Sequence, residues 1–83
     1  MKKIFISVNV PAVSKIYDFK ISPKMKIKDA ILLMYQIIGE DFQGILKDIN
    51  NADMFMLSCN IILKKDLRLL DYEIRDEEKF VLL

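Results

Sequence analysis

Apolar residues alternate with polar residues at both ends of this chain, and only one segment between them has helical spacing. From Ile4 to Val10, every second side chain is an aliphatic one, which is the period of a strand with one face in solvent. A similar alternation returns over residues 15–21, after the turn-forming sequence PAVSK. We therefore expect an amino-terminal hairpin of two strands, Ile4–Val10 and Lys15–Ile21.

The next segment has the spacing of an amphipathic helix, running from about Lys26 to Ile38. Its apolar stripe is made of Ile27, Ala30, Ile31, Met34, Ile37 and Ile38. Pro23 disfavours helical geometry in the residue before it, which places the boundary ahead of the helix. Gly39 is expected to cap the carboxyl end. No Ser, Thr, Asp or Asn directly precedes the first turn, so the amino end has no obvious side-chain cap.

The carboxyl-terminal half contains shorter elements. Residues 40–53 are loop-like with one helical turn packed on the core, and residues 66–74 form a compact turn with a 3₁₀ segment. Short strands are expected at Met54–Leu57, Ile61–Leu63 and Lys79–Leu83. This order predicts a single α+β domain over residues 1–83, a β-grasp mixed sheet with one main helix packed across one face. A split βαβ ferredoxin-like fold is the alternative, but it needs a second long helix.

The residue types argue against an enzyme. The 83 residues include one cysteine and no histidine, so an internal disulfide and the common zinc sites are excluded. Cys59 has no histidine to activate it as a nucleophile, and the carboxylates of residues 76–78 are expected to lie in solvent, which does not favour a catalytic role. No glycine-rich phosphate loop is present. We expect no catalytic activity, no cofactor and no metal.

Charge and hydropathy limit the partners. The net charge is +1, which does not favour general nucleic-acid binding, although residues 1–28 carry +6 and residues 29–83 carry −5. The longest uncharged apolar run, Ala30–Gly39, is about half of the ~20 residues that span a membrane. The amino-terminal MKKIFISVNVP alternates like a strand and not like an export signal. These features predict a cytoplasmic protein that is not inserted in a membrane.

The ends of the chain, MKKIFISV and LRLLDYEIRDEEKFVLL, resemble ubiquitin and its relatives. In that family a DY-x-I segment precedes the last strand, and Asp71, Tyr72 and Ile74 match it. The resemblance implies that the Tyr72 hydroxyl braces a loop. A buried tyrosine needs a partner for its hydroxyl, and a turn offers free backbone groups.

A narrower resemblance lies in VNVPAVSKIYDFKISPKMKI, which is similar to the EsaB/YukD family of bacterial ubiquitin-like proteins of type VII (WXG100) secretion systems. The matching residues are Val8, Val10, Pro11, Ala12, Tyr17, Asp18, Ile21 and Pro23. This resemblance implies a cytoplasmic accessory protein without catalytic activity that binds components of the secretion machinery. Relatives often carry glycine in the turn before the last strand, where this chain has Glu77.

The sequence ends in KFVLL and not in the flexible Gly-Gly tail that covalent modifiers and sulfur carriers use, so we expect no conjugation. Alternation directs an apolar set of side chains away from the core, and the register of residues 54–57 decides whether the two methionines or Phe55 and Leu57 join it. With the latter pair, the predicted protein-binding face consists of Phe5, Phe55, Leu57, Val81 and Leu83. A secretion component is the expected partner. The alternative is a structural domain that forms homo-oligomers through this face.

Overall fold

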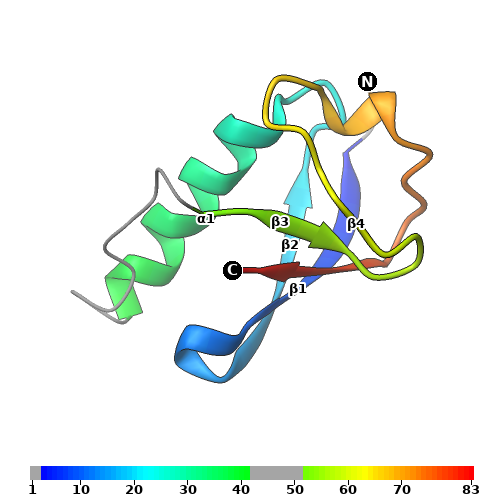
Figure 1. Cartoon of the computed structure of the whole chain (residues 1–83). Coiled ribbons are helices and arrows are strands. Elements are labelled where there is room, and N and C mark those ends of the chain that lie inside the picture. Colours follow the sequence, from blue (N-terminus) through cyan, green and yellow to red (C-terminus); the bar gives the residue numbers. More distant parts are fainter. Residues whose placement is uncertain (1–2, 42–51) are drawn as a thin grey trace.

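A computed structural model describes residues 3–41 and 52–83 of the chain as a twisted sheet with one helix across it (Figure 1). The elements are β1 (Ile4–Val10), β2 (Lys15–Ile21), α1 (Ile27–Asp41), β3 (Met54–Met56), β4 (Ile61–Ile62) and β5 (Glu78–Leu82), with 3₁₀ helices at Pro11–Val13 and Leu69–Asp71. The five strands have the order β2-β1-β5-β3-β4. β1 and β5 are parallel, whereas every other neighbouring pair is antiparallel. The predicted β-grasp fold is confirmed.

The boundaries differ from the prediction in the second half more than in the first. Both hairpin strands have the predicted limits, whereas β5 begins and ends one residue earlier than expected. The prediction that Gly39 caps the helix is wrong, since α1 continues to Asp41. A glycine inside a helix costs only about 1 kcal/mol, so packing elsewhere can carry the helix through it. The helical turn predicted within residues 40–53 falls mostly on residues 42–51, which lie outside the described part of the chain.

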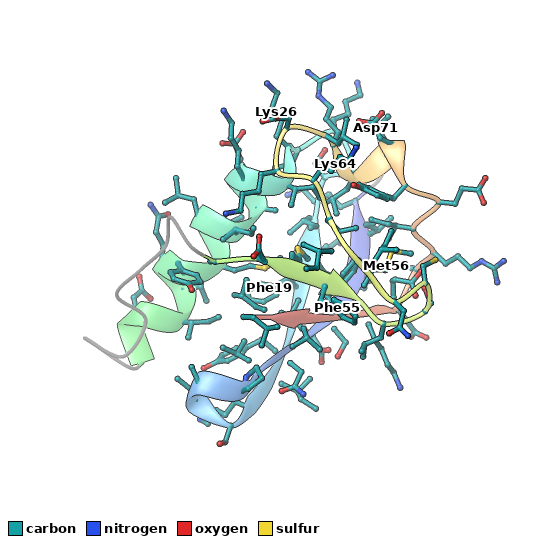
Figure 2. The ribbon with its side chains drawn as sticks, viewed as in Figure 1. Phe19, Lys26, Phe55, Met56, Lys64 and Asp71 are labelled. Atoms are coloured by element: carbon teal, nitrogen blue, oxygen red, sulfur yellow. The ribbon has the colours of Figure 1, made fainter. Side chains whose placement is uncertain are left out.

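The core lies between α1 and one face of the sheet. Its buried side chains are Ile6, Val8, Val10, Phe19, Ile21, Ile27, Ala30, Ile31, Met34, Ile38, Ala52, Met54, Met56, Leu63, Leu69, Phe80 and Leu82. Figure 2 shows Phe19 of β2 on the side of the sheet that faces the helix. Ile37, which was predicted on the helix stripe, is 40% exposed because it falls at the edge of that stripe.

The amino end of α1 is capped by backbone and not by a side chain. The N–H groups of Ile27 and Lys28 donate to the carbonyl oxygens of Leu67 and Lys65, at 2.8 and 3.2 Å. These are two of the donors that a helix leaves without an internal partner. The loop after β4 therefore replaces the cap that the sequence lacks, and it holds the helix against the carboxyl-terminal half.

Tyr72 braces the same loop, as the resemblance to ubiquitin implied. Its hydroxyl oxygen accepts a hydrogen bond from the Lys64 N–H at 2.8 Å. Asp71 contributes a second link, because its Oδ2 accepts from the Arg68 N–H at 2.8 Å (Lys64 and Asp71 are labelled in Figure 2). The expected bracing role of Tyr72 is confirmed.

Within residues 3–41 and 52–83, no helix combines the length and the apolar character that crossing a membrane requires.

Candidate protein-binding face

The face of the sheet that points away from α1, called the outer face here, carries a row of side chains that crosses all five strands. The pairing register places one residue of each strand in this row, in the order Ile16, Asn9, Val81, Phe55 and Ile62. Four of the five are apolar. Because the neighbours of these residues along each strand point into the core or into a turn, the row faces solvent.

Exposure along this row is greatest at its ends. Ile16 on β2 is 68% exposed and Ile62 on β4 is 59% exposed. Val81 and Phe55, in the middle, are half-buried because they pack between neighbouring strands. The row therefore forms an apolar stripe with a firm centre and accessible ends, which suits contact with another protein.

The structure settles the register that the sequence left open. Met54 and Met56 are buried, so Phe55 points outward, and Leu57 follows it at the start of the turn with 46% of its surface exposed. The Leu57 N–H donates to the Lys79 carbonyl at 3.2 Å, which places Leu57 beside β5. Leu83 lies at the opposite end of β5, held by a reciprocal pair of 2.9 Å hydrogen bonds with the Asp53 backbone. Phe55 and Val81 thus pair at the centre of this group, and Leu57 and Leu83 lie two positions away on opposite sides of the pair.

Phe5 lies apart from that group. It occupies the outer face of β1, but Asn9 is the β1 residue level with Val81, so Phe5 is four positions away along the strand. Ser7 and Lys79, which pair across β1 and β5, lie in between. The predicted five-residue face is therefore divided into a main patch and a separate aromatic side chain.

Phe5 has its own surroundings. The Lys20 Nζ atom lies 5.3 Å from the centre of its ring, a cation–π arrangement. Beside the ring is an open hollow of about 420 Å³, lined by Phe5, Ile6, Ser7, Asp18, Glu77 and Lys79. The Phe5 N–H donates to Asp76 Oδ1 at 2.9 Å, which fixes the backbone at this end of β1.

Sequence reasoning missed Ile16 and Ile62. The alternation over residues 15–21 carried a signal for Ile16, because Tyr17, Phe19 and Ile21 alternate on the opposite face. For Ile62 no such signal existed, since β4 is only two residues long and both are isoleucine. The row becomes visible only when the strands are placed in register.

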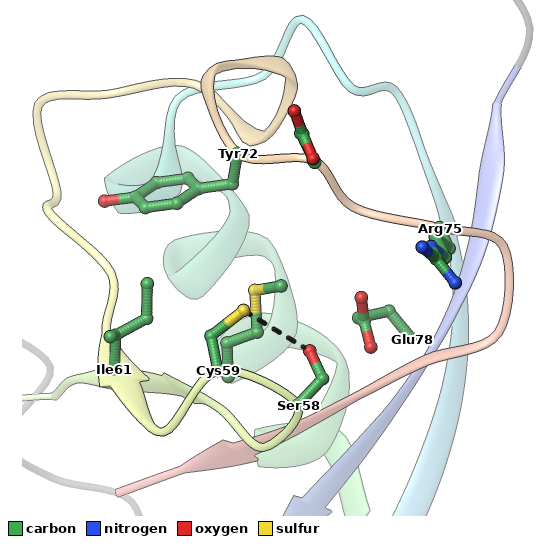
Figure 3. A pocket seen from close by; sticks show the side chains of 8 residues that line it. Ser58, Cys59, Ile61, Tyr72, Arg75 and Glu78 are labelled. Carbon is green, nitrogen blue, oxygen red and sulfur yellow. Dashed lines mark hydrogen bonds between the residues drawn. The ribbon is translucent and has the colours of Figure 1, made fainter.

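A second hollow, of about 390 Å³, lies between the β3–β4 turn and the segment that follows the second 3₁₀ helix (Figure 3). It is lined by Met56, Ser58, Cys59, Ile61, Tyr72, Glu73, Arg75 and Glu78. The exposed Cys59 thiol contacts the Ser58 hydroxyl at 3.7 Å. In Figure 3 Tyr72 stands on the opposite side of the hollow from Cys59. Among residues 3–41 and 52–83, no group of three or more His, Cys, Asp or Glu side chains is arranged to hold a metal ion.

Comparison with known proteins identifies relatives by structure alone. No protein-family model matches the chain, and no curated protein matches its sequence. The ubiquitin-like domain of Arabidopsis thaliana protein At2g32350 is 19% identical, with a TM-score of 0.75, over 100% of this chain and 78% of that one. The N-terminal ubiquitin-like domain of the 4931431F19Rik protein is 12% identical, with a TM-score of 0.77, over 99% and 74%.

A third solved structure, described as "Molecular Mimicry of SUMO promotes DNA repair", is 14% identical with a TM-score of 0.77, over 100% of this chain and 92% of that one. At these identities the likeness concerns the fold. The chain is a ubiquitin-like β-grasp domain.

Proposed function

We propose that this chain is a non-enzymatic, ubiquitin-like adaptor that binds a protein partner through the apolar row of the outer face. The pairing of Phe55 with Val81 carries the proposal, because two half-buried apolar side chains form the firm centre of a solvent-facing sheet surface. Such a centre with exposed apolar ends has the make-up of an interface, in which a few anchors supply most of the binding energy. Leu57 and Ile62 extend it toward the β4 edge.

The setting that we propose is the cytoplasmic side of a bacterial type VII secretion system, with a component of that machinery as the partner. The support is the similarity of residues 8–23 to the EsaB/YukD family. The ubiquitin-like fold agrees with that similarity, since the proteins of that family are ubiquitin-like. A self-associating structural domain without a secretion role is the alternative.

Binding to purified secretion components, chosen from the genes beside the gene of this chain, tests the proposal. We expect the wild-type chain to bind one of them, and we expect Phe55→Ser and Ile62→Asp each to weaken that binding at least about tenfold. Leu32→Ser is the matched control, because Leu32 is an exposed leucine on α1, away from the sheet. Circular dichroism would verify that each variant is folded.

Two results would overturn the proposal. One is a gene neighbourhood without any WXG100 protein or secretion ATPase, together with no binding to such proteins in vitro. The other is a binding partner whose affinity falls with Leu32→Ser and not with Phe55→Ser, which would place the contact surface on the helix.

A further inference from the structure

On the outer face, β2 and β5 lie on either side of β1 and carry charged residues at the same levels. At each level the charge on β2 is opposite in sign to the charge on β5. Ser7 of β1 pairs with Asp18 on β2 and with Lys79 on β5, so a negative and a positive side chain flank the same β1 residue. Two positions along β1 the signs are reversed. At the level of Phe5, the positive Lys20 lies on β2 and the negative Glu77 lies on the other side of β1, just before β5.

The reversed pair flanks Phe5. Lys20 is the β2 partner of Phe5, and the Glu77 N–H donates to the Phe5 carbonyl at 2.7 Å. All four charged side chains are exposed. None of the four takes part in an ion pair within the described ranges, where Lys65 and Asp53 form a surface pair at 3.7 Å. Lys20 lies over the Phe5 ring, and all four charged groups remain accessible to a partner at the surface.

We propose that the strands β2, β1 and β5 of the outer face form the interface of a symmetric homodimer, with the two-fold axis lying along β1. Rotation about this axis places β2 of one copy over β5 of the other. Asp18 then faces Lys79 of the second copy, and Lys20 faces Glu77 of the second copy. Because the interface is isologous, each of these pairs occurs twice, which gives four opposite-charge contacts.

The residues on the axis strand are suited to meeting their own copies. A residue on a two-fold axis faces itself, so it must be self-complementary. Asn9 and Ser7 each carry both hydrogen-bond donor and acceptor groups, and Phe5 can stack on a second phenylalanine. Lys3 precedes β1, at the end of the sheet. There the angle of about 30° between packed sheets moves the strands of the two copies apart.

Several other ways of stacking this face on itself bring like charges together or leave a charge unpaired. An axis along β5 would place Lys79 against Lys79 of the second copy. An axis across the strands, along the row that contains Ser7, would oppose Asp18 to Asp18 and Lys79 to Lys79. An axis midway between β1 and β5 would set Asp18 against Leu57 and leave its charge unpaired. An axis across the strands, midway between the Phe5 row and the Ser7 row, would also oppose unlike charges, but it sets Phe5 against Ser7 and does not bring Ile16 over Val81. The axis along β1 satisfies both charged rows and also opposes these two apolar side chains, and like-charge contacts are strongly unfavourable at interfaces.

The apolar and hollow parts of the face agree with the same axis. Ile16 on β2 and Val81 on β5 lie level with Asn9, so the rotation places each against the other across the interface. The hollow of about 420 Å³ beside Phe5 offers room for the Phe5 ring of the second copy. Phe5 is 49% exposed in the single chain, and this dimer would cover it.

This dimer leaves the β3–β4 side of the outer face open. Phe55, Leu57 and Ile62 lie beyond β5, on the strands that the rotation does not cover. The dimer inference shares Val81 and Ile16 with the adaptor proposal, whereas the adaptor anchors Phe55, Leu57 and Ile62 stay uncovered. Its test measures the mass of the purified chain in solution, whereas the adaptor test measures binding to a different protein.

Charge exchange between two variants tests the dimer and its axis together. We expect the wild-type chain to show concentration-dependent dimerisation by analytical ultracentrifugation that weakens as salt is raised. Asp18→Lys and Lys79→Asp alone should each weaken it roughly 100-fold, because two attractive pairs become repulsive. An equimolar mixture of the two variants should dimerise again, because each new charge faces its opposite in the mixed dimer.

The double variant Asp18→Lys/Lys79→Asp should also recover dimerisation, because it exchanges the two charges within each copy. Asp66→Lys and Lys24→Asp are the matched controls, since both residues are exposed and lie off the sheet face. They should leave dimerisation unchanged. A wild-type chain that remains monomeric at about 1 mM would overturn the inference, and so would single variants that dimerise as the wild type does. Failure of the equimolar mixture of the two single variants to dimerise would contradict the proposed two-fold axis along β1.

Discussion

The hydroxyl oxygen of Tyr72 lies 2.8 Å from the backbone nitrogen of Lys64, eight residues earlier in the chain, and accepts its hydrogen bond. This contact closes the loop that leads from β4 to the second 3₁₀ helix. The same loop supplies the carbonyl oxygens of Lys65 and Leu67 to the first turn of α1. A single phenolic group thus stabilises both the loop and the start of the helix.

Replacing Tyr72 with phenylalanine should remove this hydrogen bond and keep the packing of the ring. We expect the free energy of unfolding to fall by about 1 kcal/mol, the usual net contribution of one such bond. Urea denaturation followed by circular dichroism measures the change. Tyr72→Leu, which also removes the ring, should cost more; equal losses from the two variants would show that the hydroxyl contributes nothing.

Replacing Gly39 with alanine should stabilise the protein. Gly39 lies inside α1, and nothing lies within 4 Å of the position that a Cβ atom would occupy. Alanine restricts the unfolded chain and favours helix, which predicts a gain of about 0.5–1 kcal/mol. Thermal denaturation measures it. An unchanged or lower midpoint would contradict the continuation of the helix through residue 39.

Replacing Glu77 with glycine should also stabilise the fold. Glu77 has φ = 66°, a left-handed conformation, in the turn before β5. A side chain there costs roughly 1 kcal/mol relative to glycine, so Glu77→Gly should recover part of that. Glu77→Ala is the matched control, because it removes the charge and keeps the Cβ atom. A gain shared equally by both variants would assign the effect to charge.

Replacing Val81 with aspartate should abolish binding through the outer face. Val81 lies at the centre of the apolar row, between Asn9 and Phe55, and its side chain is half-buried on the face away from α1. We expect the variant to remain folded with a stability loss of about 1–2 kcal/mol, since a strand residue between two neighbours tolerates a charge poorly.

Circular dichroism and affinity for the partner measure the two effects of Val81→Asp. Phe80→Asp is the comparison, because Phe80 is fully buried on the opposite face of the same strand and its loss should unfold the protein. A folded Phe80→Asp or an unfolded Val81→Asp would reverse the assignment of the two faces of β5.

The first half of the fold was predictable because its strands and helix are long enough to show a clear hydrophobic period. Seven-residue strands and a helix of several turns show their spacing directly in the sequence, so the hairpin and α1 were placed with few errors. The run at residues 54–57 is apolar at every position and has no period. Its register follows from pairing with β5, where Met56 is level with the buried Phe80.

The candidate site could be predicted only in part for the same reason. Residues that share a strand can be assigned to one face by alternation, which found Phe5 and Val81. Residues of different strands are brought level by pairing across the sheet, and the sequence of one strand alone does not determine this register. The distance between Phe5 and the main patch, the row that ends in Ile62, and the charges flanking β1 all depend on that register.

The strand that joins the two halves of the sheet, β5, is the last of the described strands to be synthesised. The β1 edge of the hairpin stays unpaired until β5 arrives, because β3 and β4 connect to the hairpin only through β5. During synthesis the β1 edge of the amino-terminal hairpin therefore stays open until residues 78–82 have been made. Closure over such a long stretch of chain is slow.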